Sequence, residues 1–563
     1  MADSNETKVY DIYASVLNFK RAIGNFNRPG IDFTWIPQEH LRRLKAYELL
    51  EAFYYNYSRD YRFAPESGDA SHNDDIFEAG DAAWVCRKIK AKLFGEGMTI
   101  AMEMPDELKG LKTADQTAEA QKNAAPLLAL QDSLSAREDY IKRWWKDNNI
   151  FLSIDENETL CSYLGDCAYL VEWVKEIENG IEVGRPGLRT YDPGFVLPFY
   201  NCNDKSLEDN STPVKDRVII TWQETSKAIV DNVGQDQSFV IFRDIYELRI
   251  GAMGEKKCFR KSGYYKYNAS TEIDLLNLVD DNLLNEEDKT WEDLGIDFMP
   301  VVCIPNITVQ GHDFGLSNLH FLIGVLDAII NADTDIKKNS EKLGGASVFV
   351  AGKDISLARD PITKKPQAIS IQPNTIYPLG EGGSATLLDT ANMQKAILDT
   401  KAVLEKKLLR NSNITEIGAG AIDVQQLSTL SIKILMQPLL DMINPMRDQR
   451  NRYYSTIFFY VQRLFQTFGT SEEQGIFADP LYDFFLKWGK ILPDDDKAKL
   501  EEYGILEKLT DTETMLEKMK EDGYPIDIKK VMERKKAAAD QQAQSQMDIF
   551  GLGRQINNQG GGQ

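Results

Sequence analysis

The chain has 563 residues, of which 42% are hydrophobic and 10% aromatic, so it can bury a substantial core. Its length predicts several domains, because one domain usually has about 100–200 residues. The formal net charge of −22 argues against a tight grip on nucleic acid, which needs lysine and arginine to displace counterions. An acidic surface is still compatible with DNA that slides past it, and it keeps a large assembly in solution.

Neither membrane insertion nor a disulfide framework is expected. No apolar run approaches the roughly 20 residues that span a bilayer. Residues 1–13 lack the basic and apolar regions of a signal peptide, so we expect synthesis in a cytosol. The six cysteines are scattered without a Cys-x-x-Cys pair, and the histidines complete no ligand spacing. We therefore expect reduced, mostly buried thiols, no metal and no other cofactor.

The N-terminal region is predicted to be helical. After an arm at 1–39, a broad apolar stripe predicts a helix at His40–Asn56. A second helix is expected at Asp74–Phe94, because glycines follow it, and a third runs from Ser133 or Ser135 to Asn148.

Between Phe151 and Ile250 the pattern changes to β-structure. Short β-branched and aromatic runs alternate with Gly, Pro and Asn/Asp clusters, which predicts strands. The runs are Ala168–Val174, Ile181–Val183, Val218–Trp222 and Phe239–Leu248. Asn179-Gly180 predicts a hairpin turn between the first two, and Phe298–Pro305 predicts a further, buried strand.

Two long helices then bracket a small β-rich segment. Leu316–Leu343 carries its apolar residues in its first half and would be about 40 Å long. The second helix is expected at Asp389–Arg410. The segment between them contains the predicted strands Ser347–Ala351, Ala368–Gln372 and Thr375–Leu379.

The C-terminal part begins with a loop at 411–427. A long helix follows to Phe468, and Pro438 and Pro445 should kink it because each removes a backbone hydrogen bond. Shorter helices are expected at 490–540. The Gln/Asn/Gly-rich tail, 541–563, lacks the apolar surface to fold and is predicted to be disordered.

The stretch 300–343 carries the most specific pattern. An apolar strand ending in Pro and Asn precedes a Gly315-x-Ser317 turn and a helix with a Leu-Ile-x-x-Leu-Asp-Ala core at Leu322–Ala328. Gly165–Leu170, with the sequence GDCAYL, adds a second pattern. In this order, across about 40–470, the segments resemble tailed-bacteriophage portal (head-to-tail connector) proteins. The specificity lies in the order of the motifs.

The resemblance implies an elongated, multi-domain α+β protomer. Its parts would be a wing at 40–315, a first stem helix at 316–343, a clip at 344–388, a second stem helix at 389–410, a tunnel loop at 411–427, a kinked helix and wing completion at 428–489, and a crown at 490–540. The clip is shorter than is usual in that family, and the crown has little that matches.

Portal subunits form a dodecameric ring at one capsid vertex, through which double-stranded DNA is packaged and ejected. The resemblance therefore implies a structural virion protein without a catalytic site, assembled in the host cytoplasm. The implied partners are further copies of the chain, double-stranded DNA in the channel, the terminase large subunit, a head-tail adaptor, and the major capsid and scaffolding proteins, but no membrane.

The tunnel loop is one candidate contact site. From 411 to 432 the chain has no lysine or arginine, so it could touch phosphates only weakly. We predict a narrow, mobile gate beside DNA; the alternative is an ordinary surface loop. The candidate residues are Asn411, Asn413, Glu416, Asp423, Gln425 and Gln426.

The clip is the other candidate contact site, because it has a local basic excess in an acidic protein. Its cations are Lys353, Arg359, Lys364 and Lys365, set against Asp354 and Asp360. We predict that they dock acidic surfaces of a packaging motor or tail adaptor; the alternative is a solvated loop.

Motifs of enzymes are incomplete. Gly352-Lys353 is followed by Asp354 rather than Ser or Thr, which excludes a P-loop. Asn331-x-Asp333-x-Asp335 resembles the start of a calcium loop, but Ile336 stands where glycine must turn, so we interpret it as part of the first long helix. Two other classes stay open: another virion neck or baseplate protein, and a glycan- or nucleic-acid-processing enzyme with an unrecognised site.

Overall fold

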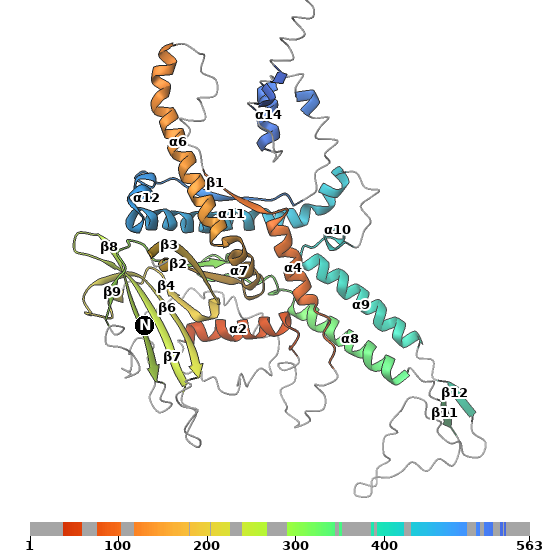
Figure 1. The fold of residues 1–563 in the computed structure, drawn as a ribbon. Coiled ribbons are helices and arrows are strands. Elements are labelled where there is room, and N and C mark those ends of the chain that lie inside the picture. The colour runs from red at the N-terminus through yellow and green to blue at the C-terminus, as the bar shows by residue number, and fades with distance from the viewer. Residues whose placement is uncertain are drawn as a thin grey trace, which may run out of the picture. The chain divides into compact units, whose positions relative to one another are not determined.

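The computed structural model describes residues 38–58, 76–102, 118–178, 181–202, 204–225, 239–266, 290–343, 348–351, 384–387, 391–420 and 429–491, with 503–506, 512–521, 528, 530–532 and 534–535. The chain divides into two compact units, residues 1–491 and 492–563. The first contains both helices and sheets, so the predicted α+β class is confirmed (Figure 1).

Among the described residues, the first unit contains four antiparallel sheets, and the two with three or more strands form its body. The smaller has the order β10-β2-β3, and the larger the order β4-β6-β7-β8-β9 with β5 also paired to β6. Their bounds are β2 Asp166–Glu178, β3 Ile181–Tyr191, β4 Val196–Phe199, β5 Asp204–Lys205, β6 Pro213–Thr225, β7 Phe239–Ile250, β8 Lys256–Lys266, β9 Glu292–Asp293 and β10 Val301–Pro305. The four predicted runs between 168 and 248 fall inside β2, β3, β6 and β7, and the predicted strand Phe298–Pro305 begins three residues before β10. Glu178 pairs with Ile181, as expected for the predicted hairpin.

Five helices of this unit pack on or near the sheets: α2 Gln38–Tyr54, α4 Asp81–Phe94, α6 Ala118–Asp147, α7 Ile150–Leu164 and α11 Thr429–Phe468. The helix α2 confirms its prediction. The predicted start of α4 at Asp74 is wrong, because Gly80 precedes the helix in the left-handed conformation, with φ 87°. The predicted start of α6 near Ser133 is also wrong, since the helix begins at Ala118.

The helix α7 was not predicted, because its segment was assigned to the β region. Polar residues on its inner side, including Asn157, Glu158 and Ser162, are buried by contacts with other elements. This burial hides the apolar periodicity that would have indicated a helix.

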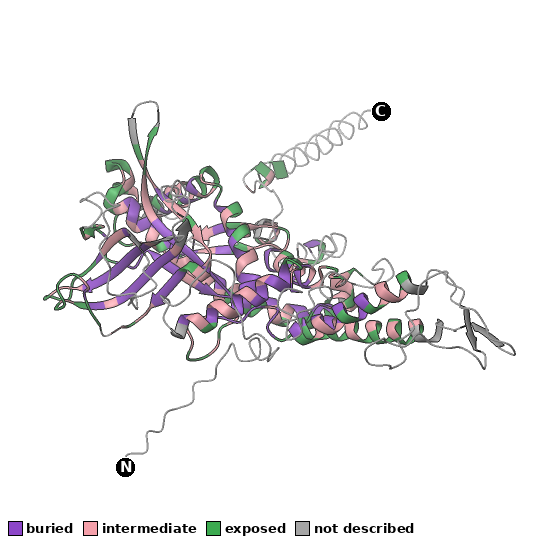
Figure 2. Cartoon of the chain, turned by 90° about the horizontal axis from the view of Figure 1, so that it is seen from below, coloured by how far each residue is buried: buried purple, intermediate pink, exposed green. Residues whose placement is uncertain are grey.

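The main core contains side chains of both sheets and of α11, with further side chains from α6 and α7. Figure 2 shows the buried residues, in purple, gathered along strands and the inner sides of helices. The helix α11 contains both Pro438 and Pro445, and Figure 1 shows its first turns tilted away from the rest. After it come α12 Ser471–Ile476 and β13 Phe484–Trp488, which pairs with β1 Met98–Met102.

The two long helices lie side by side (Figure 1). They are α8 Ile323–Leu343 and α9 Ala391–Asn411. The predicted start at Leu316 is wrong, because Leu316 forms a β-bridge with Ile307 and the next residues bond to other elements. Between the helices, β11 Val348–Ala351 confirms one predicted strand; it pairs with β12 Ser384–Leu387, which was not predicted. The predicted strands at 368–372 and 375–379 lie outside the described residues.

The second unit contains α14 Thr512–Glu521 and a small core of Tyr503, Met515 and Leu516. It begins at Leu492, next to the predicted boundary at 490. The tail at 541–563 lies outside the described residues. None of the helices that the structure describes has both the length and the apolar character needed to cross a bilayer.

Candidate functional site

The helix pair α8–α9 is held in register by a partly buried ion pair. Lys401 Nζ of α9 lies 2.5 Å from Asp333 Oδ1 of α8, and the Asp333 side chain is only 6% exposed. The hydrogen bond from Lys401 to Asp333 raises the pKa of the lysine. One residue on, Thr334 Oγ1 accepts a hydrogen bond from the Phe77 backbone at 3.0 Å, which links α8 to the segment before α4.

This contact explains the calcium-like pattern at Asn331, Asp333 and Asp335. All three residues are helical, as interpreted from the sequence, and Asp333 turns toward Lys401. The pattern therefore arises from the polar half of a helix that packs against a second one.

The outer faces of α9 are open. Leu398 and Val403 are each 53% exposed. Because an α-helix turns about 100° per residue, these two residues point to different sides of α9. Lys406, Lys407 and Arg410 are also exposed. The helix α8 thus covers only part of α9 and leaves apolar side chains on two sides without cover from the described residues.

Two glycines approach each other closely between the end of α7 and the loop before α8. Asn306 donates its backbone N–H to Gly165 O at 2.7 Å, and its side chain donates to Leu316 O at 3.1 Å. A Cβ on Gly315 would lie 2.6 Å from Asn306 N and 2.6 Å from Gly165 O. A Cβ on Gly165, whose φ is +108°, would lie 2.7 Å from Ser317 N. Only glycine fits at either position.

The buried carboxyl group of Asp166 adds hydrogen bonds at the point where the two glycines meet. Asp166 accepts a hydrogen bond from Gly315 N at 2.7 Å and another from the hydroxyl of Tyr47. Burial raises the pKa of Asp166 to about 6, although Tyr47, Gly315 and the cations of Arg43 and Arg450 lower it. Asp166 therefore ties the loop before α8 to both β2 and α2.

A fully buried ion pair lies next to this junction. Arg450 Nε is 2.8 Å from Glu158 Oε1, and neither side chain is more than 1% exposed. Arg450 also donates to Pro305 O at 2.8 Å and to Asn306 Oδ1 at 2.9 Å. The pair thus connects α11, α7 and the end of β10. Such a pair positions elements rather than adding much stability, because desolvation offsets the attraction.

Sequence reasoning missed Arg450, although a signal was present. It occupies an inward position in the apolar stripe of α11, between Ile443, Met446, Tyr454 and Ile457. A charged residue in such a stripe requires a partner. The identity of Glu158 could not be inferred, since the two residues are 292 positions apart.

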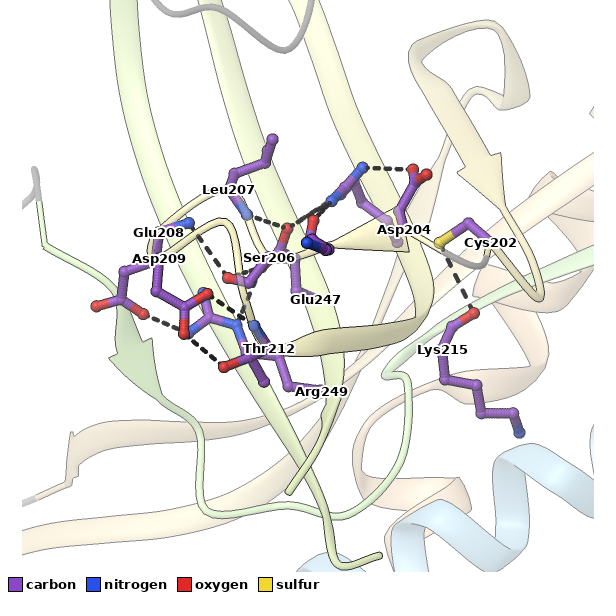
Figure 3. A network of polar contacts seen from close by, with 12 residues as sticks. Cys202, Asp204, Ser206, Leu207, Glu208, Asp209, Thr212, Lys215, Glu247 and Arg249 are labelled. Carbon is purple, nitrogen blue, oxygen red and sulfur yellow. Dashed lines mark hydrogen bonds and ion pairs between the residues drawn. The ribbon is translucent and has the colours of Figure 1, made fainter. Parts of the chain in front are cut away.

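The large sheet carries a second buried network (Figure 3). Glu247 is 0% exposed and accepts hydrogen bonds from Arg217 Nε and Arg249 Nε, both at 3.0 Å. Ser206 Oγ donates to the same carboxylate at 2.9 Å. Asp204 pairs with Arg217 at 3.0 Å and Glu208 pairs with Arg249, so the two cations face three carboxylates and the network holds the loop around Ser206 against β6 and β7.

The structure describes three of the predicted channel-loop residues. Asn411 ends α9, Asn413 has φ 55°, and Glu416 begins the short helix α10 Glu416–Ala419; all three are exposed. The prediction of a plain loop is wrong for 416–419, because Thr415 caps a helical turn through Gly418 N at 3.1 Å. Asp423, Gln425 and Gln426 lie outside the described residues, as do the clip residues Lys353, Arg359, Lys364 and Lys365.

All six cysteines are free, and four of them are buried, as predicted. Burial raises the pKa of Cys86 to about 12, so this thiol stays protonated at neutral pH. Within the part of the chain that the structure describes, no cluster of three or more His, Cys, Asp or Glu side chains could hold a metal ion.

No protein-family model matches the chain, and no curated protein is similar to it.

Proposed function

We propose that this protein is a portal-type ring subunit. Copies of it would surround a channel at one capsid vertex, through which double-stranded DNA is packaged and ejected. The observation that carries the proposal is the pair α8 and α9, which lie side by side and are joined through the strand pair β11–β12. A glycine-tight junction attaches this pair to an α+β body.

The exposed faces of α9 support the assembly of a ring. Leu398 and Val403 lie on two sides of one helix, so two neighbours would be needed to cover them. A contact between unlike faces of identical subunits repeats around an axis and closes into a ring when the rotation allows it. The helix pair would then line the channel.

The negative charge of the chain favours movement of DNA through the channel over tight binding of DNA. A net charge of −22 gives weak overall attraction for DNA, so the duplex could slide. In this proposal, residues 411–427 form the gate beside DNA, and the cations of 344–388 dock the terminase or a tail and neck protein. The energy for packaging would come from that partner.

The proposal is tested by mass photometry and negative-stain imaging of the purified chain. We expect rings close to a dodecamer with a central hole. Leu398→Glu and Val403→Glu should each prevent ring formation, because they place charge in an apolar contact. Met253→Glu is the matched control, since Met253 is 95% exposed on the β7–β8 turn and should change nothing.

Circular dichroism spectra at 20 °C should be the same for the wild type and all three variants, which shows that the fold is unchanged; the two α9 variants should melt at a lower temperature because they lose the stabilisation that assembly gives. A wild-type chain that stays monomeric at micromolar concentration would contradict the proposal. So would rings that form normally in both α9 variants.

A further inference from the structure

A cleft of about 340 Å³ separates the two sheets at the C-terminal end of α11. One wall is β2, the opposite wall is β9 with the residues after it, and the end of α11 contributes apolar side chains. The residues that matter for its chemistry are Glu172, Trp173, Glu292, Leu294, Leu464 and Phe468.

One wall of the cleft is an unpaired strand edge. The strand β10 pairs with β2 only from Asp166 to Leu170, and Val171 N donates to Pro300 O at 2.9 Å. Beyond that point no described strand pairs with this side of β2, although β3 continues on the other side to Glu178. In an antiparallel strand, alternate residues direct their N–H and C=O to the same side. Trp173 therefore directs its backbone groups to the side that Val171 uses for Pro300.

The opposite wall is also a sheet edge. The strand β9 is the last in the order β4-β6-β7-β8-β9, so among the described residues only β8 pairs with it. A strand edge with unused donors and acceptors is a template for another strand. Extended peptides bind proteins in this way, and the alternation of their side chains gives specificity.

The apolar side of the cleft fits such a segment. Phe468 is 38% exposed, and its ring centroid is 5.8 Å from that of Trp173. Leu464 and Leu294 extend the same apolar surface. Because alternate side chains of a strand point to opposite faces, an inserted strand would place every second residue on this surface.

The charge at the rim favours a cation. Arg260 is held by Asp244 at 2.8 Å, and Glu172 lies 2.6 Å from Arg189. Arg260 and Lys175 are the two cations of the lining. Glu292 is exposed and forms no ion pair with any described residue. The rim thus has a carboxylate that a lysine or arginine of a ligand could neutralise.

We propose that this cleft binds an extended peptide segment of a partner protein by strand addition to β2. An apolar residue of the segment would lie on Leu464 and Phe468, and a basic residue would lie beside Glu292. The cleft is built within one chain, so this site does not depend on ring formation.

The test uses a fluorescein-labelled probe peptide of alternating valine and threonine with one central lysine. Its binding to the full chain is followed by fluorescence polarisation at physiological ionic strength. We expect saturable binding. A probe N-methylated at alternate residues should lose it, because the backbone hydrogen bonds to β2 can no longer form.

A charge exchange tests the position of the basic residue. Glu292→Lys should weaken the lysine probe about three- to tenfold and strengthen a probe with glutamate in that place. Asp335→Lys, at an exposed acid of α8, is the matched control and should leave both affinities unchanged. Phe468→Ala should weaken both probes equally.

Three results would overturn the proposal. One is equal affinity for the plain and N-methylated probes, and another is the absence of saturation in the millimolar range. The third is a smaller species in sedimentation when the probe is added, because a second copy of the chain rather than a partner would then occupy the cleft. Unchanged melting of Glu292→Lys would confirm that the variant is folded.

Discussion

Asp166 connects β2 to α2 and to the loop before α8, and burial of its charged form costs free energy. Its carboxyl is fully buried, and two hydrogen bonds and two nearby arginines compensate that burial only in part. Burial raises the pKa of Asp166 from 3.8 to about 6, so the native state binds this proton more tightly than the unfolded chain does. The contribution of this group to stability is therefore fully present below about pH 4 and is lost as pH rises through 6.

The variant Asp166→Asn should remove this dependence. Between pH 4 and pH 7.5, the free energy of unfolding of the wild type should fall relative to the variant by roughly 3 kcal/mol, at about 1.4 kcal/mol for each pH unit between the two pKa values. Urea denaturation at a series of pH values measures this difference. Tyr47→Phe should move this pH window upward. In the wild type the hydrogen bond from Tyr47 lowers the pKa of Asp166, so its removal raises that pKa. A difference that is constant with pH would refute the assignment.

At the scale of elements, the position of α8 depends on close backbone contact as well as on side chains such as Asp166. Gly165 and Gly315 meet where the end of α7 lies against the loop before α8, and hydrogen bonds from Asn306 cross the same point. These glycines belong to the sequence patterns GDCAYL and Gly-x-Ser. Their shared physical role is to let two backbones approach without a Cβ between them.

Gly165→Ala should destabilise the protein much more than Gly254→Ala. Both glycines have positive φ, +108° and +85°, but a Cβ at Gly254 would meet nothing within 4 Å. Gly254→Ala should cost about 1–2 kcal/mol from conformation alone, and Gly165→Ala more than about 3 kcal/mol because backbone atoms must also move. Urea denaturation compares the two free energies, and hydrogen exchange of residues 306–322 should accelerate only in Gly165→Ala. Equal costs would show that the approach is not tight.

At the scale of the molecule, the chain has two units with separate cores. The large core of the first joins both sheets with α6, α7 and α11, and the small core of the second contains side chains of short helices. A unit with its own core can fold alone.

Removal of 492–563 should leave the first unit intact. We expect the melting temperature of residues 1–491, measured by circular dichroism, to stay within about 2 °C of the main transition of the full chain. The urea midpoint serves as a second measurement. A fragment that aggregates or melts far below the full chain would show that the first unit depends on the second.

Local patterns in the sequence determined much of this architecture. Alternation of apolar and polar residues located β2, β3, β6 and β7, and Asn179-Gly180 located the hairpin. Long apolar stripes located α2, α8, α9 and α11. The helical pattern of α8 was also the correct interpretation of its calcium-like residues, which lie within that helix. These features depend on interactions between residues near one another in the chain, so the sequence reports them directly.

Tertiary structure alone decided the junction, the buried pair and the cleft. The sequence of α7 lacks a clear helical period of apolar residues, because a position on its inner face is occupied by Glu158, which pairs with Arg450, 292 positions away. The start of α8 moves to Ile323 because the residues before it bond to β2 and α7. On one side of β2, pairing with a described strand ends at Leu170, where β10 begins. Each outcome depends on which distant segments meet, and that is settled by packing of the whole chain rather than by any local pattern.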